Sequence, residues 1–189
     1  MTRDRPRPGC GSLRMSSGLA ALRLLVVDDN PQMRNIVGTV LTGAGVRTLR
    51  YAPDGRRGLE SLAEFRPDVC YVDYEMPEMD GLEFISAVRA MTSDDRYIPI
   101  IMLTGHSDMK RLNAARDRGV TEFLAKPVTA KTILTRLSAV IFHPRPFISC
   151  NSFFGPDRRR RRVEGYNGPF RRSTDAVAPR DTRGDVLEL

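Results

Sequence analysis

Four places in the chain carry side chains suited to phosphate chemistry, although they lie far apart in the sequence. They are the pair Asp28 and Asp29, then Asp73, Thr104 and Lys126. Each follows or ends a short apolar run, at residues 24–27, 69–72, 98–103 and 123–125. Apolar runs separated by helical patterns predict the buried strands of a parallel sheet, whose carboxyl ends line one crevice. We therefore expect the four places to converge on one site.

Three carboxylates in a small volume predict a metal site. Two unit charges ~4 Å apart repel by roughly 4 kcal/mol at an effective dielectric constant of about 20, so the cluster should bind a proton or a hard cation. Oxygen ligands suit Mg²⁺, which leaves coordination positions open for a phosphoryl oxygen. The turn-rich loop at residues 75–81, which follows Asp73, can add backbone carbonyl ligands.

The polar residues after the other two strands fit the same chemistry. Thr104 offers a hydroxyl group, and Lys126 offers an ammonium group as a point charge for phosphoryl oxygens. Phosphoryl transfer needs mainly positioning and charge neutralisation. Asp73 is the candidate nucleophile, because a carboxylate can form an acyl phosphate.

The elements that must position these residues form a strictly alternating pattern. Strands are predicted at residues 22–27, 46–51, 69–73, 98–103 and 122–125, and helices at residues 31–41, 54–65, 80–91, 108–118 and 130–141. Such alternation implies right-handed crossovers and a parallel sheet covered on both faces. The predicted fold is a doubly wound α/β domain with a five-stranded parallel sheet.

Composition and charge divide the chain into three parts. At 189 residues and 41% hydrophobic content it supports one domain with flanking segments, and no apolar stretch is long enough to span a bilayer. The net charge is +7, yet residues 22–142 hold sixteen basic and sixteen acidic residues. We therefore expect a basic flexible leader (1–21), a globular domain (22–142) and a basic tail (143–189). Three cysteines without metal-ligand spacing favour a reducing cytoplasm.

Residues 22–141 resemble the receiver domain of two-component response regulators, including the single-domain chemotaxis regulators. The resemblance rests on the segments at residues 26–30, 72–81, 102–105 and 123–127, which occur in the order and spacing of that family. It implies a flavodoxin-like fold with strand order 2-1-3-4-5. It also implies a phospho-accepting signalling domain that assists its own phosphorylation and dephosphorylation, and not an enzyme. The alternative is a pseudo-receiver in which these residues persist without phosphorylation.

The resemblance assigns a role to each site residue. It makes Asp73 the acceptor of a phosphoryl group from a histidine kinase. Asp29, Asp73 and the carbonyl of Glu75 become Mg²⁺ ligands, with Asp28 acting through bound water, and Lys126 pairs with the phosphoryl group. Thr104 and Phe123 match the switch pair, with Phe in place of the commoner Tyr. The switched protein-binding surface would comprise the helix at 108–118, the strand at 122–125 and the helix at 130–141.

The tail carries an internal repeat of the form aromatic-x-Gly-Pro-x-Arg-Arg, at residues 153–159 and 166–172. At 47 residues it is too short for an ordinary DNA-binding output domain, so DNA binding is not expected. It is similar to the arginine-rich extensions of chemotaxis-regulator-like proteins that bind cyclic di-GMP. Arginine grips phosphates and pairs with guanine, and aromatic rings add stacking surface. The candidate nucleotide-binding residues are Arg158, Arg159, Arg160, Arg161, Arg162, Tyr166, Arg171 and Arg172.

Other functions stay open for the tail and for the whole chain. The tail is also compatible with binding to an acidic protein surface. A further alternative is a solvated, disordered segment that aids solubility or binds RNA without sequence preference. For the whole chain, the alternatives are a cyclic-di-GMP-responsive effector and a phosphorelay intermediate that passes the phosphoryl group onward.

Overall fold

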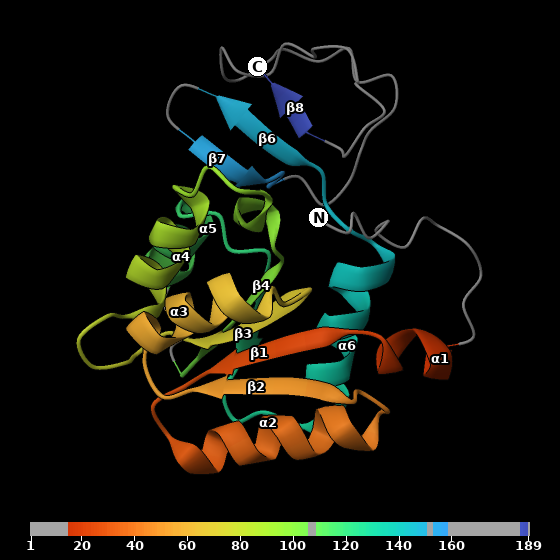
Figure 1. Ribbon diagram of the computed structural model, residues 1–189. Coiled ribbons are helices and arrows are strands. Elements are labelled where there is room, and N and C mark those ends of the chain that lie inside the picture. Colours follow the sequence, from red (N-terminus) through yellow and green to blue (C-terminus); the bar gives the residue numbers. More distant parts are fainter. Residues whose placement is uncertain (1–14, 106–108, 151–152, 159–185, 189) are drawn as a thin grey trace.

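The computed structural model describes residues 15–105, 109–150, 153–158 and 186–188. A five-stranded sheet and its helices form the main body, and three short strands form a second, smaller sheet (Figure 1). In chain order the elements are α1 (Met15–Ala20), β1 (Arg23–Val27), α2 (Pro31–Gly43), β2 (Thr48–Ala52), α3 (Gly55–Phe65), β3 (Val69–Asp73), α4 (Gly81–Arg89), the 3₁₀ helix η1 (Asp94–Tyr97), β4 (Ile100–Thr104), α5 (Met109–Asp117), β5 (Glu122–Ala125), α6 (Ala130–Phe142), β6 (Phe147–Cys150), β7 (Phe153–Pro156) and β8 (Val186–Glu188).

The main sheet has the predicted order β2-β1-β3-β4-β5, and every pair is parallel. Alternate residues of β1 face opposite sides, so Leu24 and Val26 belong to one core, and Leu25 and Val27 belong to the other. The first core is shared with α2 and α6, and the second with α3, α4 and α5. The sheet is therefore covered on both faces, which confirms the predicted doubly wound fold.

Local sequence signals fix where the helices begin, and hence where the sheet's carboxyl edge lies. Asn30 caps α2 by accepting hydrogen bonds from the amides of Gln32 and Met33, and Pro31 occupies the first turn. Asp80 and Glu83 form a capping box at the start of α4. The loops from β1 to α2 and from β3 to α4 are therefore fixed at one end by a strand and at the other by a capped helix.

The second sheet lies within the tail that the sequence predicts to be mostly irregular. Strands β6 and β7 pair antiparallel, and β6 also pairs with β8 in parallel. We call the β6–β7 pair the tail hairpin; it lies against the main body near the ends of α4 and α5 (Figure 1). Each of its strands is four residues long, and the neighbouring residues are rich in Pro, Gly and Arg. Because so short a hairpin is marginally stable alone, it depends on packing against the main body.

The remaining differences from the predicted elements lie at their ends. The second strand begins at Thr48 instead of at residue 46, while Val46 is buried in the core just before it. The predicted leader contains helix α1, and Leu19 of α1 packs against the core shared with α2 and α6. Among the described residues, no helix combines the length and apolar character needed to cross a membrane.

Candidate functional site

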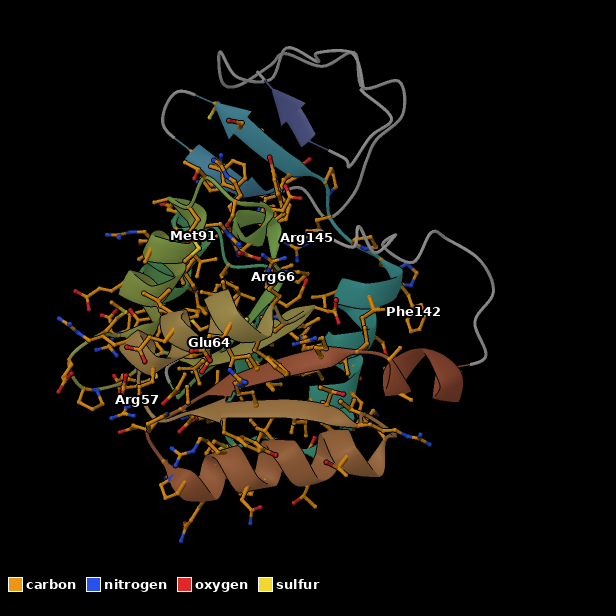
Figure 2. All side chains as sticks on the ribbon, in the orientation of Figure 1. Arg57, Glu64, Arg66, Met91, Phe142 and Arg145 are labelled. Carbon is orange, nitrogen blue, oxygen red and sulfur yellow. The ribbon has the colours of Figure 1, made fainter. Side chains whose placement is uncertain are left out.

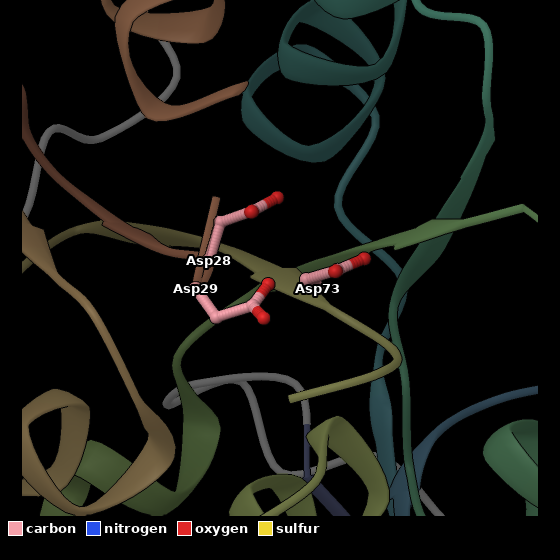
Figure 3. Close-up of side chains that lie close together, drawn as sticks. All are labelled: Asp28, Asp29 and Asp73. Carbon is pink, nitrogen blue, oxygen red and sulfur yellow. The ribbon is translucent and has the colours of Figure 1, made fainter. Parts of the chain in front are cut away.

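The structure brings the three aspartates together at the carboxyl edge of the sheet. Asp28 and Asp29 directly follow β1, and Asp73 is the last residue of the neighbouring strand β3. One carboxylate oxygen from each of the three lies within 4.8 Å of the others, and Figure 3 shows the three side chains gathered around one space. Asp28 is fully buried, Asp73 is 5% exposed, and Asp29 faces solvent. The topology of a parallel sheet therefore produces the convergence that the spacing predicts.

Lys126 supplies the positive charge of this group from the end of β5. Its Nζ lies 2.7 Å from Asp73 Oδ1 and 3.6 Å from Asp28 Oδ2. The backbone amide of Tyr74 donates a second hydrogen bond to Asp73 Oδ1, over 2.9 Å. Backbone pairing places Lys126, because its own amide donates to the carbonyl of Thr104 at the end of β4.

Burial governs the protonation of the two inner carboxylates. The pKa of Asp73 is raised by desolvation, and the hydrogen bond and charge of Lys126 only partly oppose this rise. The pKa of Asp28 is also raised, mainly by burial and then by the charge of Asp73. Both groups therefore carry negative charge at a cost in free energy, which a bound cation would relieve.

The donor set fits a hard divalent cation. Asp28 Oδ2 is buried and accepts no hydrogen bond within the described structure, although Lys126 lies near it. A buried carboxylate oxygen without a hydrogen bond is the kind of group that a metal or its bound water satisfies. Beside the carboxylates lies an open pocket lined by Asp29, Tyr74, Glu75, Met76, Pro77, Asp80 and Arg111. The Glu75 side chain pairs with Arg111 over 2.8 Å, and the predicted ligand of this residue is its backbone carbonyl.

Arg34 supports the site, although no motif in the sequence singles it out. From the first turns of α2 its guanidinium donates to the carbonyl of Asp28 over 2.6 Å and to that of Asp29 over 3.1 Å. The amide of Asn30 donates to Asp28 Oδ1 over 2.9 Å, which turns this carboxylate inward. A basic residue one turn into the helix after the aspartates was the available signal, but such residues are common on exposed helices.

The structure also places the predicted switch residues and one tail residue. Thr104 ends β4 and is buried, and Phe123 in β5 is partly buried against the core shared with α3, α4 and α5. Arg158 pairs with Asp117 over 2.9 Å and lies over the ring of Phe153. The other seven predicted nucleotide-binding residues lie outside the described part of the chain.

Comparison with known proteins agrees with this geometry. Residues 24–138 match the family model of the response regulator receiver domain. The response regulator MprA of Mycolicibacterium vanbaalenii is 34% identical over 125 residues, covering 66% of this chain and 52% of that protein. The chain therefore spans about half the length of the curated relatives it matches.

Two solved structures resemble the chain over the same region. The chemotaxis protein CheY4 of Vibrio cholerae is 36% identical with a TM-score of 0.60, covering 64% of this chain and 98% of that one. The second structure is the receiver domain of a sensor histidine kinase from Pseudomonas aeruginosa, with a magnesium ion coordinated in its active-site cleft. It is 26% identical with a TM-score of 0.57, and the match covers 62% of this chain and 94% of that one. By sequence and by fold, the chain belongs to the response regulator receiver domain family.

Proposed function

We propose that this receiver domain accepts a phosphoryl group on Asp73 from the phosphohistidine of a histidine kinase. The observation that carries the proposal is the position of Asp73, in a cluster with two further carboxylates and with a lysine 2.7 Å away. A cytoplasmic location fits this donor. The domain does not turn over a separate substrate; it modifies itself and assists that reaction.

The contacts of Asp73 divide its two oxygens by role. Among the described residues, the hydrogen bonds from Lys126 and from the Tyr74 amide to this side chain both fall on Oδ1. We assign Oδ2 as the nucleophile: its lone pair forms the new P–O bond while the P–N bond to the donor imidazole breaks and its electron pair stays on that nitrogen. With its other ring nitrogen already protonated, the donor leaves as neutral imidazole. Lys126 neutralises charge on the phosphoryl oxygens. Asp28, Asp29, Asp73 and the Glu75 carbonyl would hold Mg²⁺, which supplies charge neutralisation and orientation when bound.

The output of this reaction is a changed protein surface. Thr104 stands one strand away from Asp73, and Phe123 lies in the next strand, opposite Met102 in the β4–β5 register. Movement of the threonine hydroxyl toward a phosphoryl group would open space for the aromatic ring. The affected surface comprises α5, β5 and α6, where a protein partner would bind.

Phosphorylation by a small donor tests the proposal. With Mg²⁺ and acetyl phosphate, the intact protein should gain the mass of one phosphoryl group, and Asp73→Asn should abolish the gain. Asp94→Asn, at an exposed carboxylate in η1, is the matched control and should be phosphorylated like the parent. Mass gain that persists in Asp73→Asn would contradict the assignment. Onward transfer to a histidine phosphotransfer protein would identify a phosphorelay intermediate.

A second candidate function is the binding of cyclic di-GMP by the arginine run. The observation in its favour is the stacking of Arg158 over Phe153, with the guanidinium carbon 4.2 Å from the ring centroid, where the run begins. Calorimetric titration of cyclic di-GMP into the full chain and into a variant with Ser at positions 159–162 tests this function. Equal heats in both proteins would rule out the arginine run as the binding site.

A further inference from the structure

The tail contacts one short stretch of the main body at three points. This stretch, residues 117–122, connects the end of α5 to the start of β5. Arg158 pairs with Asp117 over 2.9 Å. Arg145, which Figure 2 labels, pairs with Glu122, and this buried glutamate also pairs with Arg136. The third contact is between backbones, where Gly155 of β7 meets Gly119.

The Gly155–Gly119 contact has no room for a side chain. A Cβ atom on Gly155 would lie 2.8 Å from the Cα of Gly119, and a Cβ on Gly119 would lie 2.9 Å from the carbonyl oxygen of Phe154. Gly119 also has a φ of 89°, which side chains disfavour. The two backbones therefore approach as closely as glycine allows, and movement of the connection must move β7 or break the contact.

Aromatic and cationic side chains hold the tail hairpin in this position. The rings of Phe147, Phe154 and Tyr97 form a triangle with centroid separations of 5.2 to 5.5 Å. Arg96 lies over the ring of Phe154 at 3.6 Å, and Arg89 lies over that of Phe147 at 5.1 Å. Such ring and cation contacts add to the area that they bury.

Arg89 links this anchor to the same connection. It is 5% exposed, and its Nε donates to the carbonyl of Gly119 over 3.0 Å while Nη1 donates to that of Arg96 over 2.6 Å. The Arg89 side chain thus lies between the hairpin ring of Phe147 and the backbone of Gly119. The hairpin and the α5–β5 connection are packed as one unit.

In the sequence, the α5–β5 connection (residues 117–122) lies between the two switch residues. Helix α5 follows Thr104 in the chain, and Phe123 comes directly after Glu122. We propose that the tail hairpin, with Arg145 and Arg158, is a clamp on the receiver switch. This inference rests on the proposed function of Asp73. The hairpin contacts and the direct Lys126–Asp73 ion pair occur in the same conformation of the protein. The clamp therefore stabilises this unphosphorylated conformation and opposes the change of conformation that phosphorylation requires. Reciprocally, phosphorylation loosens the hairpin.

Two variants release the clamp by different means. Gly155→Val removes the close backbone approach, and Arg158→Gln removes the ion pair with Asp117 at the surface. Arg56→Gln, at an exposed arginine in α3, is the charge-matched control. The affinity of each full-length protein for beryllium trifluoride with Mg²⁺, followed by fluorine NMR, measures the preference for the phosphorylated arrangement. Amide hydrogen exchange of residues 117–125 and of β6 and β7 reports the state of the clamp.

The clamp predicts linked changes in both measurements. Gly155→Val should bind beryllium trifluoride at least about threefold more tightly than the parent, Arg158→Gln by a smaller factor, and Arg56→Gln equally. In the parent, beryllium trifluoride should speed exchange in β6 and β7. The proposal would be overturned if Gly155→Val and Arg158→Gln bound beryllium trifluoride no more tightly than the parent.

Failure of the clamp and failure of the proposed function give different results. If the parent binds beryllium trifluoride and is phosphorylated but the released variants are unchanged, only the clamp is wrong. If the parent gains no phosphoryl group, the proposed function is wrong. Exchange of residues 117–125 without any ligand then still tests the packing contact by itself, because release should accelerate this exchange and unchanged exchange would refute the contact.

Discussion

Asp28 is a side chain of this site whose burial lowers the stability of the fold at neutral pH. It is completely buried, its pKa is raised, and one of its oxygens accepts no hydrogen bond among the described residues. A carboxyl group whose pKa is raised on folding stabilises the fold only at a pH below its unfolded pKa of about 3.9. This contribution is lost as the pH rises through the folded pKa, so at neutral pH the ionised group destabilises the protein.

Asp28→Asn should therefore stabilise the protein when divalent cations are absent. We expect the free energy of unfolding at pH 7 to rise by about 1 kcal/mol, because the buried charge is removed while the acceptor for the Asn30 amide is kept. Urea denaturation with and without Mg²⁺ measures this change, and the stabilisation that Mg²⁺ gives the parent should disappear. Asp94→Asn should leave both quantities unchanged. A lower free energy of unfolding for Asp28→Asn than for the parent would show that the buried charge does not destabilise the protein.

The affinity for Mg²⁺ should depend on pH through the same two groups. Protons compete with the cation for Asp28 and Asp73, and burial raises the pKa of both. We expect the affinity to fall as the pH is lowered, starting above the value of about 3.9 that is usual for aspartate. Isothermal titration with Mg²⁺ at decreasing pH tests this expectation. Affinity that stays constant until the pH approaches that usual value would contradict it.

At the scale of elements, the start of α4 is fitted tightly against the end of β3. A Cβ atom on Gly81 would lie 2.3 Å from the carbonyl oxygen of Asp73 and 3.1 Å from the Cα of Tyr74, both of which are backbone atoms. The amide of Gly81 donates to the carbonyl of Tyr74 over 3.0 Å. The loop that carries Glu75 is therefore closed by a contact between backbones next to Asp73.

Gly81→Ala should lower stability and disturb the site together. We expect the free energy of unfolding to fall by about 1 to 3 kcal/mol, because backbone must move to admit the methyl group, and acetyl phosphate should phosphorylate the protein more slowly. Gly43→Ala is the matched control, since a Cβ there meets nothing within 4 Å and alanine favours the helix. It should be neutral or stabilise by up to about 1 kcal/mol. Equal effects of the two substitutions in urea denaturation would contradict the tight fit.

The main sheet and the site were predictable because topology does most of the positioning. Asp28, Asp73 and Lys126 stand at the ends of apolar runs, and alternation with helices is enough to send all three to one edge. The tail hairpin was not predictable from local pattern. Its strands are held by Tyr97 and Arg96 in η1 and by Arg89 in α4, which lie more than forty residues away in the sequence.

At the scale of the whole molecule, the receiver core and the tail hairpin contribute separately to stability. Apart from Phe147, the buried hydrophobic residues of the described part of the chain lie between Leu24 and Val140, so the main body keeps both cores without the tail hairpin. The hairpin covers Tyr97 and helps to bury Arg89, and it closes the α5–β5 connection. Its removal should therefore weaken the fold without abolishing it.

Two truncations separate these contributions. A chain ending at residue 143 should still fold and bind Mg²⁺, but its free energy of unfolding should fall by about 2 to 4 kcal/mol, because the aromatic triangle and the ion pairs with Asp117 and Glu122 are lost. A chain ending at residue 158 keeps those contacts and should retain most of the parent's stability. Thermal unfolding should thus place the melting temperature of the shorter chain roughly 5 to 15 °C below that of the longer one. Equal melting temperatures would mean that the hairpin does not pack on the receiver in solution.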